Sequence, residues 1–364
     1  MKTEKPELII ITDMGSETGI GIYSYNLFKS LNRAGKNVAF LYTGYTPLEK
    51  EKGIIDYRRV ESNGGYLAKG LAKWINQERS KRLNLIQETN VHLCGSSYSL
   101  SHFLNNPVAT VHDLYFIKPF IKDSLKNDMT VPILAYNYNV LRNIINLKKV
   151  NNIISISDVA KKQLLLKTKK KSTVIHHWID KERFHTRDKI ISRETLNLPL
   201  NKHLLLNVSG GGPNKNLELL TSIASKLSED WVLVKIGFPL YSKNVININR
   251  LDSDLYPLLF NAADIYVHTS TFEGFGIPLI ESLGSELPVI ASNSPSSREI
   301  LGMNATYFNL SESARDIITK IQEMISKEEY NELVSLSFER SKLFSVEKII
   351  PEYINFYKKS FGIF

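Results

Sequence analysis

The stretch Thr271-Phe272-Glu273-Gly274-Phe275-Gly276-Ile277-Pro278-Leu279-Ile280-Glu281 decides the fold that the chain is expected to adopt. Short apolar runs flank it, Ile265-Tyr266-Val267 before it and Leu287-Pro288-Val289-Ile290-Ala291 after it. Such runs are typical of neighbouring strands in a buried parallel sheet. A helix is expected between them, and Pro278 suits its first position because a proline lacks the N–H that would be unpaired there. The sequence therefore predicts a strand, a loop and a helix in this order.

The loop in this stretch carries two glycines and two acids. Gly274 and Gly276 allow positive φ and let the backbone approach a ligand closely. They lead to a helix N-terminus, where unpaired N–H groups and the macrodipole favour a phosphate. Glu281 is expected in the first helical turn and Glu273 just before the helix, with seven residues between them, so that one carboxylate reaches each end of a ligand. On these features alone, an ordinary corner with two solvated acids is the alternative.

The whole string resembles the E-x7-E signature of the retaining glycosyltransferases of sequence family four, and residues 287–293 and 298–300 are similar to the same family. The resemblance implies the GT-B fold, an α/β architecture with two Rossmann-like domains that face each other across a cleft holding the active site. It also implies that Glu273 holds hydroxyl groups of the transferred sugar and that Glu281 holds the donor's ribose. Further donor contacts are implied for Gly274, Phe275, Gly276 and Ile277.

Length and composition set the broad class. The chain has 364 residues, enough for two domains with their own cores, and its 43% hydrophobic and 23% charged residues are typical of a soluble globular protein. No apolar run is long enough to span a bilayer and the opening residues do not resemble a signal peptide, so the cytoplasm is the expected compartment. The single cysteine, Cys94, excludes an intramolecular disulfide and a cysteine-built metal site.

The net charge of +9 is compatible with nucleic acid, an anionic membrane surface or phosphorylated small molecules as partners. The sequence contains no zinc-finger spacing, no aromatic RNA-binding box and no helix-turn-helix signature, so nucleic acid is not an expected partner.

Residues 66–86 predict a basic amphipathic helix, which makes the inner face of a membrane a candidate partner. An ordinary surface helix is the alternative. A second basic cluster, Lys167 with Lys169-Lys170-Lys171, lies in the same half, and each basic residue near an anionic leaflet contributes about 1 kcal/mol. The membrane-surface candidates are Lys69, Lys73, Trp74, Arg79, Lys81 and Arg82.

The first half begins with a predicted buried strand, Leu8-Ile9-Ile10-Ile11-Thr12, followed by a glycine-containing loop and a helix. The glycine spacing is not that of a dinucleotide-binding fingerprint. The loop resembles the G-G-I-G-x-Y loop of the same glycosyltransferases, with Thr18 in place of the first glycine. The resemblance implies that Gly19 and Gly21 approach the donor diphosphate or the acceptor, and a simple tight turn is the alternative.

Further predicted strands alternate with helices, which indicates an open α/β sheet. Ligands bind beyond the carboxyl ends of the strands in such sheets. His112 and Asp113 follow the predicted strand Val108-Ala109-Thr110-Val111 directly. A lone His-Asp pair is more often a strand cap, but Val111-His112-Asp113-Leu114 resembles the family's H-D-L segment. The resemblance implies that His112 contacts the transferred sugar and that Asp113 orients it.

The second half opens with the predicted strand Leu204-Leu205-Leu206-Asn207-Val208 and a glycine-rich loop. Backbone N–H groups in such a loop cradle a diphosphate, and the ammonium of Lys215 neutralises its charge. The loop resembles the family's donor loop, although positions where the family often has an arginine hold Gly210 and Asn214. A flexible turn with a solvated lysine is the alternative. The donor-binding residues implied here and in the segment facing the nucleotide base are Gly210, Gly211, Gly212, Asn214, Arg250 and Leu251.

The domain boundary is placed by the segment Val174-Ile175-His176-His177-Trp178-Ile179-Asp180-Lys181-Glu182-Arg183-Phe184, which resembles the family's crossover. We expect an N-terminal acceptor-binding domain over residues 1–185 and a nucleotide-sugar-binding domain over residues 186–345. The resemblance implies that a helix over residues 346–364 returns to the first domain.

The resemblance implies a retaining, metal-independent transfer of a hexose, of mannose or glucose type, from a UDP or GDP sugar to a lipid-linked or oligosaccharide acceptor. His112, Lys215 and Glu273 are the implied catalytic residues, and no cofactor or metal is expected. Two alternatives remain open: a nucleotide-sugar epimerase of the same fold, and a donor-binding protein that has lost turnover.

Overall fold

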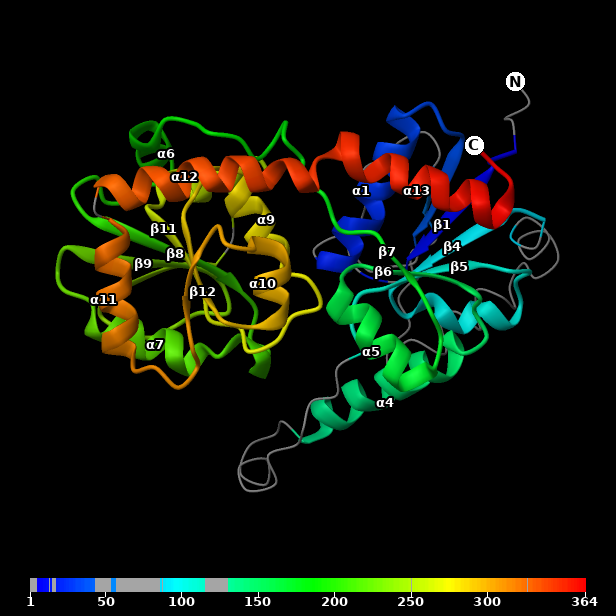
Figure 1. Cartoon of the computed structure of the whole chain (residues 1–364), viewed down its shortest axis with the longest axis horizontal. Coiled ribbons are helices and arrows are strands. Elements are labelled where there is room, and N and C mark those ends of the chain that lie inside the picture. The colour runs from blue at the N-terminus through cyan, green and yellow to red at the C-terminus, as the bar shows by residue number, and fades with distance from the viewer. Residues whose placement is uncertain are drawn as a thin grey trace. The chain divides into compact units, whose positions relative to one another are not determined.

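The computed structural model describes residues 5–12, 14, 18–42, 54–56, 86, 88–114, 130–249, 251–325 and 327–364. Contacts divide the chain into two compact units. The first comprises Met1–His176 and Ile350–Phe364, and the second comprises His177–Ile349. Each unit is built on one parallel sheet covered by helices (Figure 1).

The sheet of the first unit has the strand order β3-β2-β1-β4-β5-β6-β7 in the described part of the chain, and all neighbours pair in parallel. The order reverses between β1 and β4, which makes this edge of the sheet a topological switch point. The strands are β1 (Leu8–Thr12), β2 (Val38–Tyr42), β3 (Ile54–Asp56), β4 (Asn90–Cys94), β5 (Val108–Val111), β6 (Asn152–Ser155) and β7 (Thr173–Val174).

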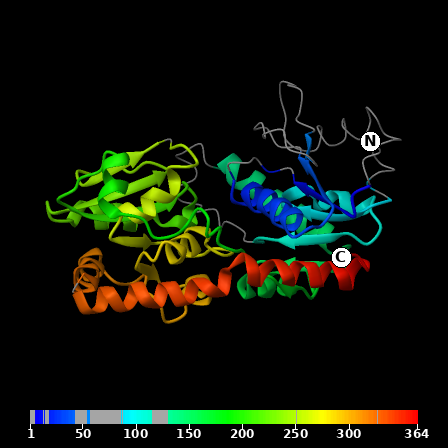
Figure 2. The same ribbon diagram turned by 90° about the horizontal axis from the view of Figure 1, so that it is seen from above.

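Alternate side chains of these strands face two helical layers. Ile9 and Ile11 join a core with α4 (Thr130–Leu147), α5 (Asp158–Thr168) and the 3-10 helix η1 (Gly95–His102). On the other face lie α1 (Gly19–Arg33) and α13 (Val346–Phe361), drawn in blue and red in Figure 2, which contact each other through the hydroxyls of Tyr23 and Tyr353. Phe28 of α1 stacks on Phe40 of β2, with ring centroids 5.5 Å apart.

The second unit repeats the plan with the described strand order β10-β9-β8-β11-β12-β13, again parallel throughout. Its switch point lies between β8 and β11. Both strands are buried apolar runs, as expected for a sheet covered on two faces. The strands are β8 (His203–Ser209), β9 (Trp231–Gly237), β10 (Val245–Ile248), β11 (Ile265–His268), β12 (Val289–Ser292) and β13 (Thr306–Phe308).

Two helical layers also cover this sheet. Leu205 and Val267 share a core with α7 (Leu217–Lys226) and α11 (Ala314–Met324). Phe260 of α8 (Tyr256–Ala262) stacks on Tyr266 on the opposite face. The remaining helices of the unit are α6 (Lys189–Thr195), η2 (Pro213–Lys215), α9 (Ile277–Gly284), α10 (Pro295–Leu301), α12 (Lys327–Ser341) and η3 (Lys342–Phe344).

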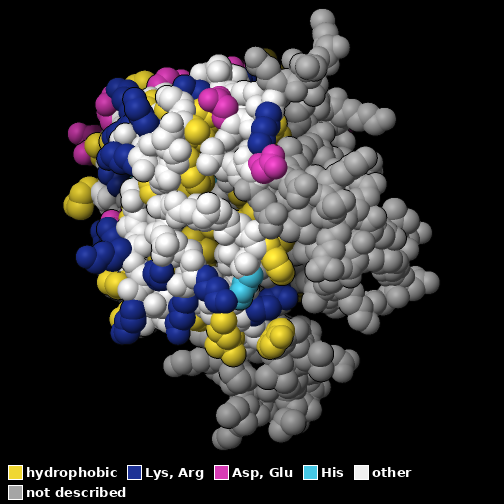
Figure 3. Space-filling model, turned by 90° about the vertical axis from the view of Figure 1, so that its right-hand side faces the viewer, with side chains coloured by type: hydrophobic (Ala, Val, Ile, Leu, Met, Phe, Trp, Pro, Cys, Tyr) yellow, Lys and Arg dark blue, Asp and Glu magenta, His cyan; other side chains and the backbone are white. Residues whose placement is uncertain are grey.

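The predicted basic helix cannot be placed, because residues 66–85 and all six membrane-surface candidates lie outside the described residues. The second basic cluster is described: α5 ends at Thr168, and Lys169 follows it with φ of 61°. On the face of the first unit that Figure 3 shows, Lys and Arg side chains lie among polar and hydrophobic ones. Within the described residues, no helix has both the length and the apolar character needed to span a membrane.

Candidate functional site

The candidate site lies at the switch point of the second unit. The chain leaves β8 through residues 209–216, which we call the glycine loop, and leaves β11 through residues 269–276, which we call the acidic loop. β8 and β11 are parallel neighbours, with Leu205 beside Ile265. Because both loops follow the carboxyl ends of adjacent strands, they meet where open α/β sheets bind ligands.

Lys215 and Glu273 join the two loops. The Nζ of Lys215 lies 2.5 Å from the Oε1 of Glu273, and the side chains are 24% and 14% exposed. The hydroxyl of Ser270 donates to the same oxygen at 2.8 Å. Burial alone raises the pKa of Glu273, but the ammonium of Lys215 and these hydrogen bonds outweigh it and hold the pKa below its usual value. The carboxylate is therefore charged at neutral pH.

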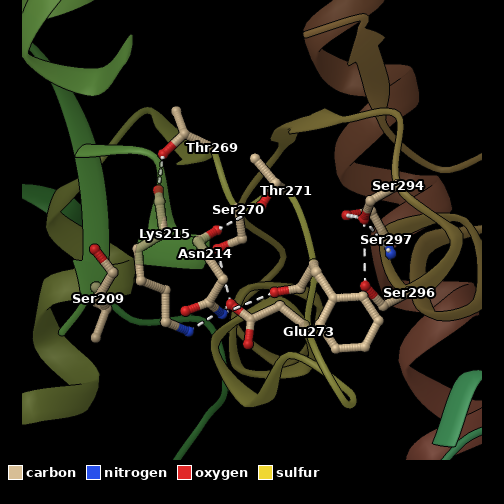
Figure 4. A network of polar contacts seen from close by, with 12 residues as sticks. Ser209, Asn214, Lys215, Thr269, Ser270, Thr271, Glu273, Ser294, Ser296 and Ser297 are labelled. Atoms are coloured by element: carbon tan, nitrogen blue, oxygen red, sulfur yellow. Dashed lines mark hydrogen bonds and ion pairs between the residues drawn. The ribbon is translucent and has the colours of Figure 1, made fainter. Parts of the chain in front are cut away.

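Further hydrogen bonds tie the loops together (Figure 4). The hydroxyl of Thr269 donates to the carbonyl of Lys215, and the backbone N–H of Thr271 donates to the carbonyl of Asn214, both at 2.8 Å. The side-chain amide of Asn214 donates to the carbonyl of Phe272 at 2.8 Å. Asn214, an implied donor contact, thus holds the acidic loop in place.

The three glycines of the glycine loop have different surroundings. A Cβ at Gly211 would lie 2.5 Å from the ring of Phe238, and one at Gly212 would lie 2.7 Å from the side-chain oxygen of Asn214. A Cβ at Gly210 would meet nothing within 4 Å. Packing within the protein therefore accounts for the lack of a side chain at Gly211 and Gly212, whereas Gly210 faces open space.

The helix after the acidic loop begins one residue before the predicted position. Ile277 is the first residue of α9, so Pro278 is the second, and Gly276 is the N-cap with φ of 110°. Positive φ is found at Gly276 and not at Gly274. A Cβ at Gly276 would lie 2.9 Å from the Cδ1 of Leu279, so close packing and backbone conformation both require glycine here.

Glu281 is not in the first turn of α9, and this prediction was wrong. Because the helix begins at Ile277, Glu281 is its fifth residue and points to α8, where the hydroxyl of Tyr256 donates to its Oε2 at 2.9 Å. Burial raises the pKa of Glu281 to about 7, against the hydrogen bond from Tyr256 and the positive charge of Arg183. A buried carboxyl group whose pKa is shifted close to physiological pH is a candidate for contact with a ligand.

Phe275 lies between the glycines of the acidic loop, and its side chain is part of the core. Its ring packs edge-on against His177, with centroids 4.9 Å apart, and against Phe344 at 6.0 Å. The contact with the donor that is implied for Phe275 would therefore be made by its backbone atoms.

Three residues near these loops were not among the predicted site residues. Tyr256 of α8 donates a hydrogen bond to Glu281 of α9, and no local sequence pattern predicts this contact between two helices. His268 is 4% exposed, and its Nε2 has no hydrogen-bond partner among the described residues. Burial lowers the pKa of His268 to about 4, so the ring is neutral. Lys235 is a charged residue inside the apolar run Val232-Leu233-Val234-Lys235-Ile236, and this interruption was a usable signal.

In the first unit, His112 directly follows β5, as predicted. Its side chain is 7% exposed and packs edge-on against Tyr23 of α1, with ring centroids 4.8 Å apart. Burial lowers its pKa to about 3, so the imidazole is neutral at physiological pH. Asp113 is exposed.

A buried polar network lies beneath His112. The hydroxyl of Tyr23 is 3.0 Å from that of Thr110 and 2.9 Å from that of Tyr353 in α13. His92 continues the chain of contacts, with its Nε2 2.7 Å from the hydroxyl of Thr110 and its Nδ1 2.6 Å from that of Tyr357. The last helix and α1 are thereby joined to β5, the strand that His112 follows.

The other implied residues are placed as follows. Gly19 is the first residue of α1, and the N–H of Gly21 donates to the hydroxyl of the N-cap Thr18 at 3.0 Å. Leu251 is half-buried, and Arg250 lies outside the described residues. Within the described part of the chain, no group of three or more His, Cys, Asp or Glu side chains is arranged to hold a metal ion.

Residues 188–335, which lie inside the second unit, match the family model described as "Glycosyl transferases group 1". The second unit belongs to this family. Both candidate loops lie within the matched residues, so the group 1 match covers the Lys215–Glu273 pair. The resemblance inferred from the acidic loop is therefore confirmed at the level of the family.

Two curated relatives of this protein are bacterial mannosyltransferases. The "O-antigen chain mannosyltransferase B" of Escherichia coli is 32% identical over 29% of this chain and 28% of its own length. The "O-antigen chain mannosyltransferase RfbU" of Salmonella typhimurium is 25% identical over 62% of this chain and 63% of its own length. The matches thus span less than two thirds of these relatives.

Solved structures resemble this protein along nearly its whole length. A sucrose-phosphate synthase from Thermosynechococcus elongatus has a TM-score of 0.75 at 18% identity, covering 98% of this chain and 99% of its own. The Anabaena protein HepE, in complex with UDP and glucose, has a TM-score of 0.73 at 14% identity, covering 96% and 98%. The likeness confirms the predicted GT-B fold.

Proposed function

We propose that this protein is a retaining glycosyltransferase that moves a hexose from a nucleotide diphosphate sugar to a lipid-linked or oligosaccharide acceptor without a metal. The single observation that carries the proposal is the ion pair of Lys215 and Glu273 at the sheet's switch point. It places a cation and a charged carboxylate beside a glycine loop and a helix N-terminus, an arrangement that suits a sugar attached to a phosphate.

The comparisons support the choice of substrates. The relatives in Escherichia coli and Salmonella typhimurium are named mannosyltransferases, which favours a hexose of mannose type. The structural neighbour HepE holds UDP-glucose in another of its structures, which favours a nucleotide diphosphate sugar as the donor.

In the proposed reaction, the bond between the sugar C1 and the donor phosphate breaks while a bond forms between C1 and the acceptor oxygen. The acceptor's proton passes to the departing phosphate. Negative charge grows on the diphosphate, and Lys215 with the N–H groups of Gly276 and Ile277 is assigned to stabilise it. Positive charge grows on the sugar ring, and Glu273 is assigned to its hydroxyl groups.

Two further residues complete the proposed donor contacts. Glu281 is assigned to the ribose, whose hydroxyls donate to a carboxylate that Tyr256 already orients from the other side. His112 is assigned to the transferred sugar: since its imidazole is neutral, one ring nitrogen accepts and the other donates a hydrogen bond.

The acceptor assignment rests on the positive charge of the protein. The net charge of +9 and the basic cluster after α5 favour an acceptor presented at an anionic membrane surface, where the cytoplasmic protein would bind peripherally.

The test is turnover by the purified chain. Incubation with UDP- and GDP-hexoses in the presence of EDTA should release the nucleoside diphosphate from one of them above background, through slow donor hydrolysis without an acceptor. Glu273→Gln should lower this rate about 100-fold or more, whereas Glu323→Gln, an exposed change on α11, should leave it unchanged. With an acceptor, NMR of the product should show the donor's anomeric configuration. Nucleotide binding without release of product would instead favour a donor-binding protein that lacks turnover.

A further inference from the structure

Lys235 is a buried cation close to the glycine loop. It lies on β9 in register with Asn207 of β8 and Asn247 of β10, and the residue is 1% exposed. Burying a charge is costly unless it is paired or fully hydrogen-bonded. Among the described residues no carboxylate acts on Lys235, and the charged neighbour that does is a second ammonium, that of Lys215. The free-energy cost of burying this charge indicates that Lys235 has a specific role.

The hydrogen bonds of Lys235 hold the start of the glycine loop. Its Nζ donates to the carbonyl of Ser209 at 2.6 Å and to that of Ile236 at 2.6 Å. Ser209 is the last residue of β8, and its carbonyl also accepts from the N–H of Phe238 at 3.0 Å. A Cβ at Gly237 would lie 2.4 Å from the same oxygen, so the end of β9 packs directly against the point where the loop begins.

The charges around the loop do not balance. Lys215 is paired with Glu273, whereas the acceptors of Lys235 among the described residues are carbonyl oxygens. The loop from Gly210 to Asn214 holds no cationic side chain of its own. Burial, with a smaller contribution from Lys215, lowers the pKa of Lys235 to about 8, so an anion nearby would stabilise its charged form.

We propose that Lys235 is a positioning residue that supplies the second positive charge of a diphosphate site at the glycine loop. It acts from beneath the loop, by fixing the carbonyl of Ser209 and by its field on the phosphates, and does not contact them. This inference rests on the proposed function, since the ligand is the diphosphate of the donor.

The experiment compares a nucleoside diphosphate with the monophosphate of the same base, using whichever of UDP, GDP, ADP or CDP the full chain binds. Titration calorimetry gives both affinities for the wild type, Lys235→Met, Lys235→Arg and the control Lys226→Met, an exposed change at the end of α7. Lys235→Met should weaken the diphosphate about tenfold and the monophosphate much less. Lys226→Met should change neither.

A pH series separates charge from packing. Wild-type affinity for the diphosphate should fall from about pH 7.5 to about pH 9.5 as Lys235 loses its proton, while Lys235→Arg stays charged and should bind with a flatter profile. Among the described residues, the other titratable groups of this cluster are Glu273 and His268, whose pKa values lie below this window, and Tyr266, whose pKa burial raises above it. The affinity for the monophosphate, measured over the same pH series, corrects for Glu281, which titrates near pH 7 at the proposed ribose position.

Equal binding of the diphosphate by the wild type and Lys235→Met would overturn the inference and leave the proposed function standing. A matched loss of diphosphate and monophosphate affinity would also overturn it, because it would indicate a purely structural role. If Lys235→Met does not fold, a Lys235→Arg profile as steep as that of the wild type overturns it. If the wild type binds no nucleotide, the proposed function itself fails, and this inference fails with it.

Discussion

The ammonium of Lys215 and the carboxylate of Glu273 form an ion pair across 58 positions of sequence because β8 and β11 are neighbours in the sheet. The glycine loop supplies the cation and the acidic loop supplies the anion. The ammonium of Lys215 helps to hold the pKa of Glu273 below its usual value, and both side chains stand where a phosphate and a sugar would meet in the proposed reaction.

The pair should be energetically coupled. Lys215→Met leaves a carboxylate without its cation and should raise the pKa of Glu273 and lower the free energy of unfolding by about 2 kcal/mol. Adding Glu273→Gln should recover part of that loss, since the unpaired charge is removed. Urea unfolding of the two single variants and the double variant measures the coupling, and strictly additive losses would contradict it.

Gly276 should tolerate no side chain. Gly276→Ala places a Cβ at a φ of 110° and against Leu279, and should lower the free energy of unfolding by about 1–3 kcal/mol. Gly210→Ala is the matched control, because its Cβ meets nothing within 4 Å. Thermal unfolding should leave Gly210→Ala near the wild type, while nucleotide affinity falls because the methyl group occupies the open side of the loop. A stable Gly276→Ala would contradict the placement of α9.

Glu281 should contribute a loss of stability to the second unit as pH rises from about 4.5 to 7, whereas His268, whose pKa burial lowers to about 4, contributes in the opposite sense up to about pH 6.5. The pKa of Glu281 is raised to about 7 in the folded state, so the folded chain binds more protons than the unfolded chain in this window. The full effect is at most about 3 kcal/mol. Glu281→Gln should remove this part of the pH dependence, and unfolding in urea at several pH values tests it. The same slope in the variant would show that Glu281 is not the group responsible.

The first unit should respond in the opposite sense. Burial lowers the pKa values of His92 and His112 to about 3, so the unfolded chain binds more protons between about pH 3 and 6.5, and stability is lost as pH falls through this range. Tyr353→Phe, which removes the hydroxyl bonded to Tyr23, should add a loss of about 1 kcal/mol. Hydrogen exchange of β4 and β5 amides as a function of pH measures this unit separately. Slower exchange at acid pH, after correction for intrinsic rates, would contradict it.

The local pattern of the sequence was sufficient to predict the acidic loop and the strands on either side of it. Apolar runs, glycines and a proline act over a few residues, and β11, α9 and β12 formed as those residues indicate. The prediction of the position of Glu281 in the helix was wrong because the first residue of the helix depends on one backbone conformation, the positive φ of Gly276. One residue of difference moved the carboxylate out of the first turn.

Contacts between distant elements were beyond such reasoning. The bond from Tyr256 to Glu281 depends on how α8 and α9 pack, and the buried network of Tyr23, His92 and Tyr353 joins three elements far apart in the chain. Lys235 is different, because a lysine in the middle of an apolar strand is visible in the sequence. The free-energy cost of burying its charge identifies it as a candidate functional residue.

The most direct test of the central claim is the thermal midpoint of the full chain with UDP, GDP, ADP and CMP, each with and without magnesium. One nucleotide at a hundredfold excess over its dissociation constant should stabilise the protein by about 2.7 kcal/mol. The rise should not need magnesium, and Glu281→Ala should abolish it. No change in midpoint with any of the four nucleotides would contradict the assignment of the glycine and acidic loops to a nucleotide diphosphate sugar.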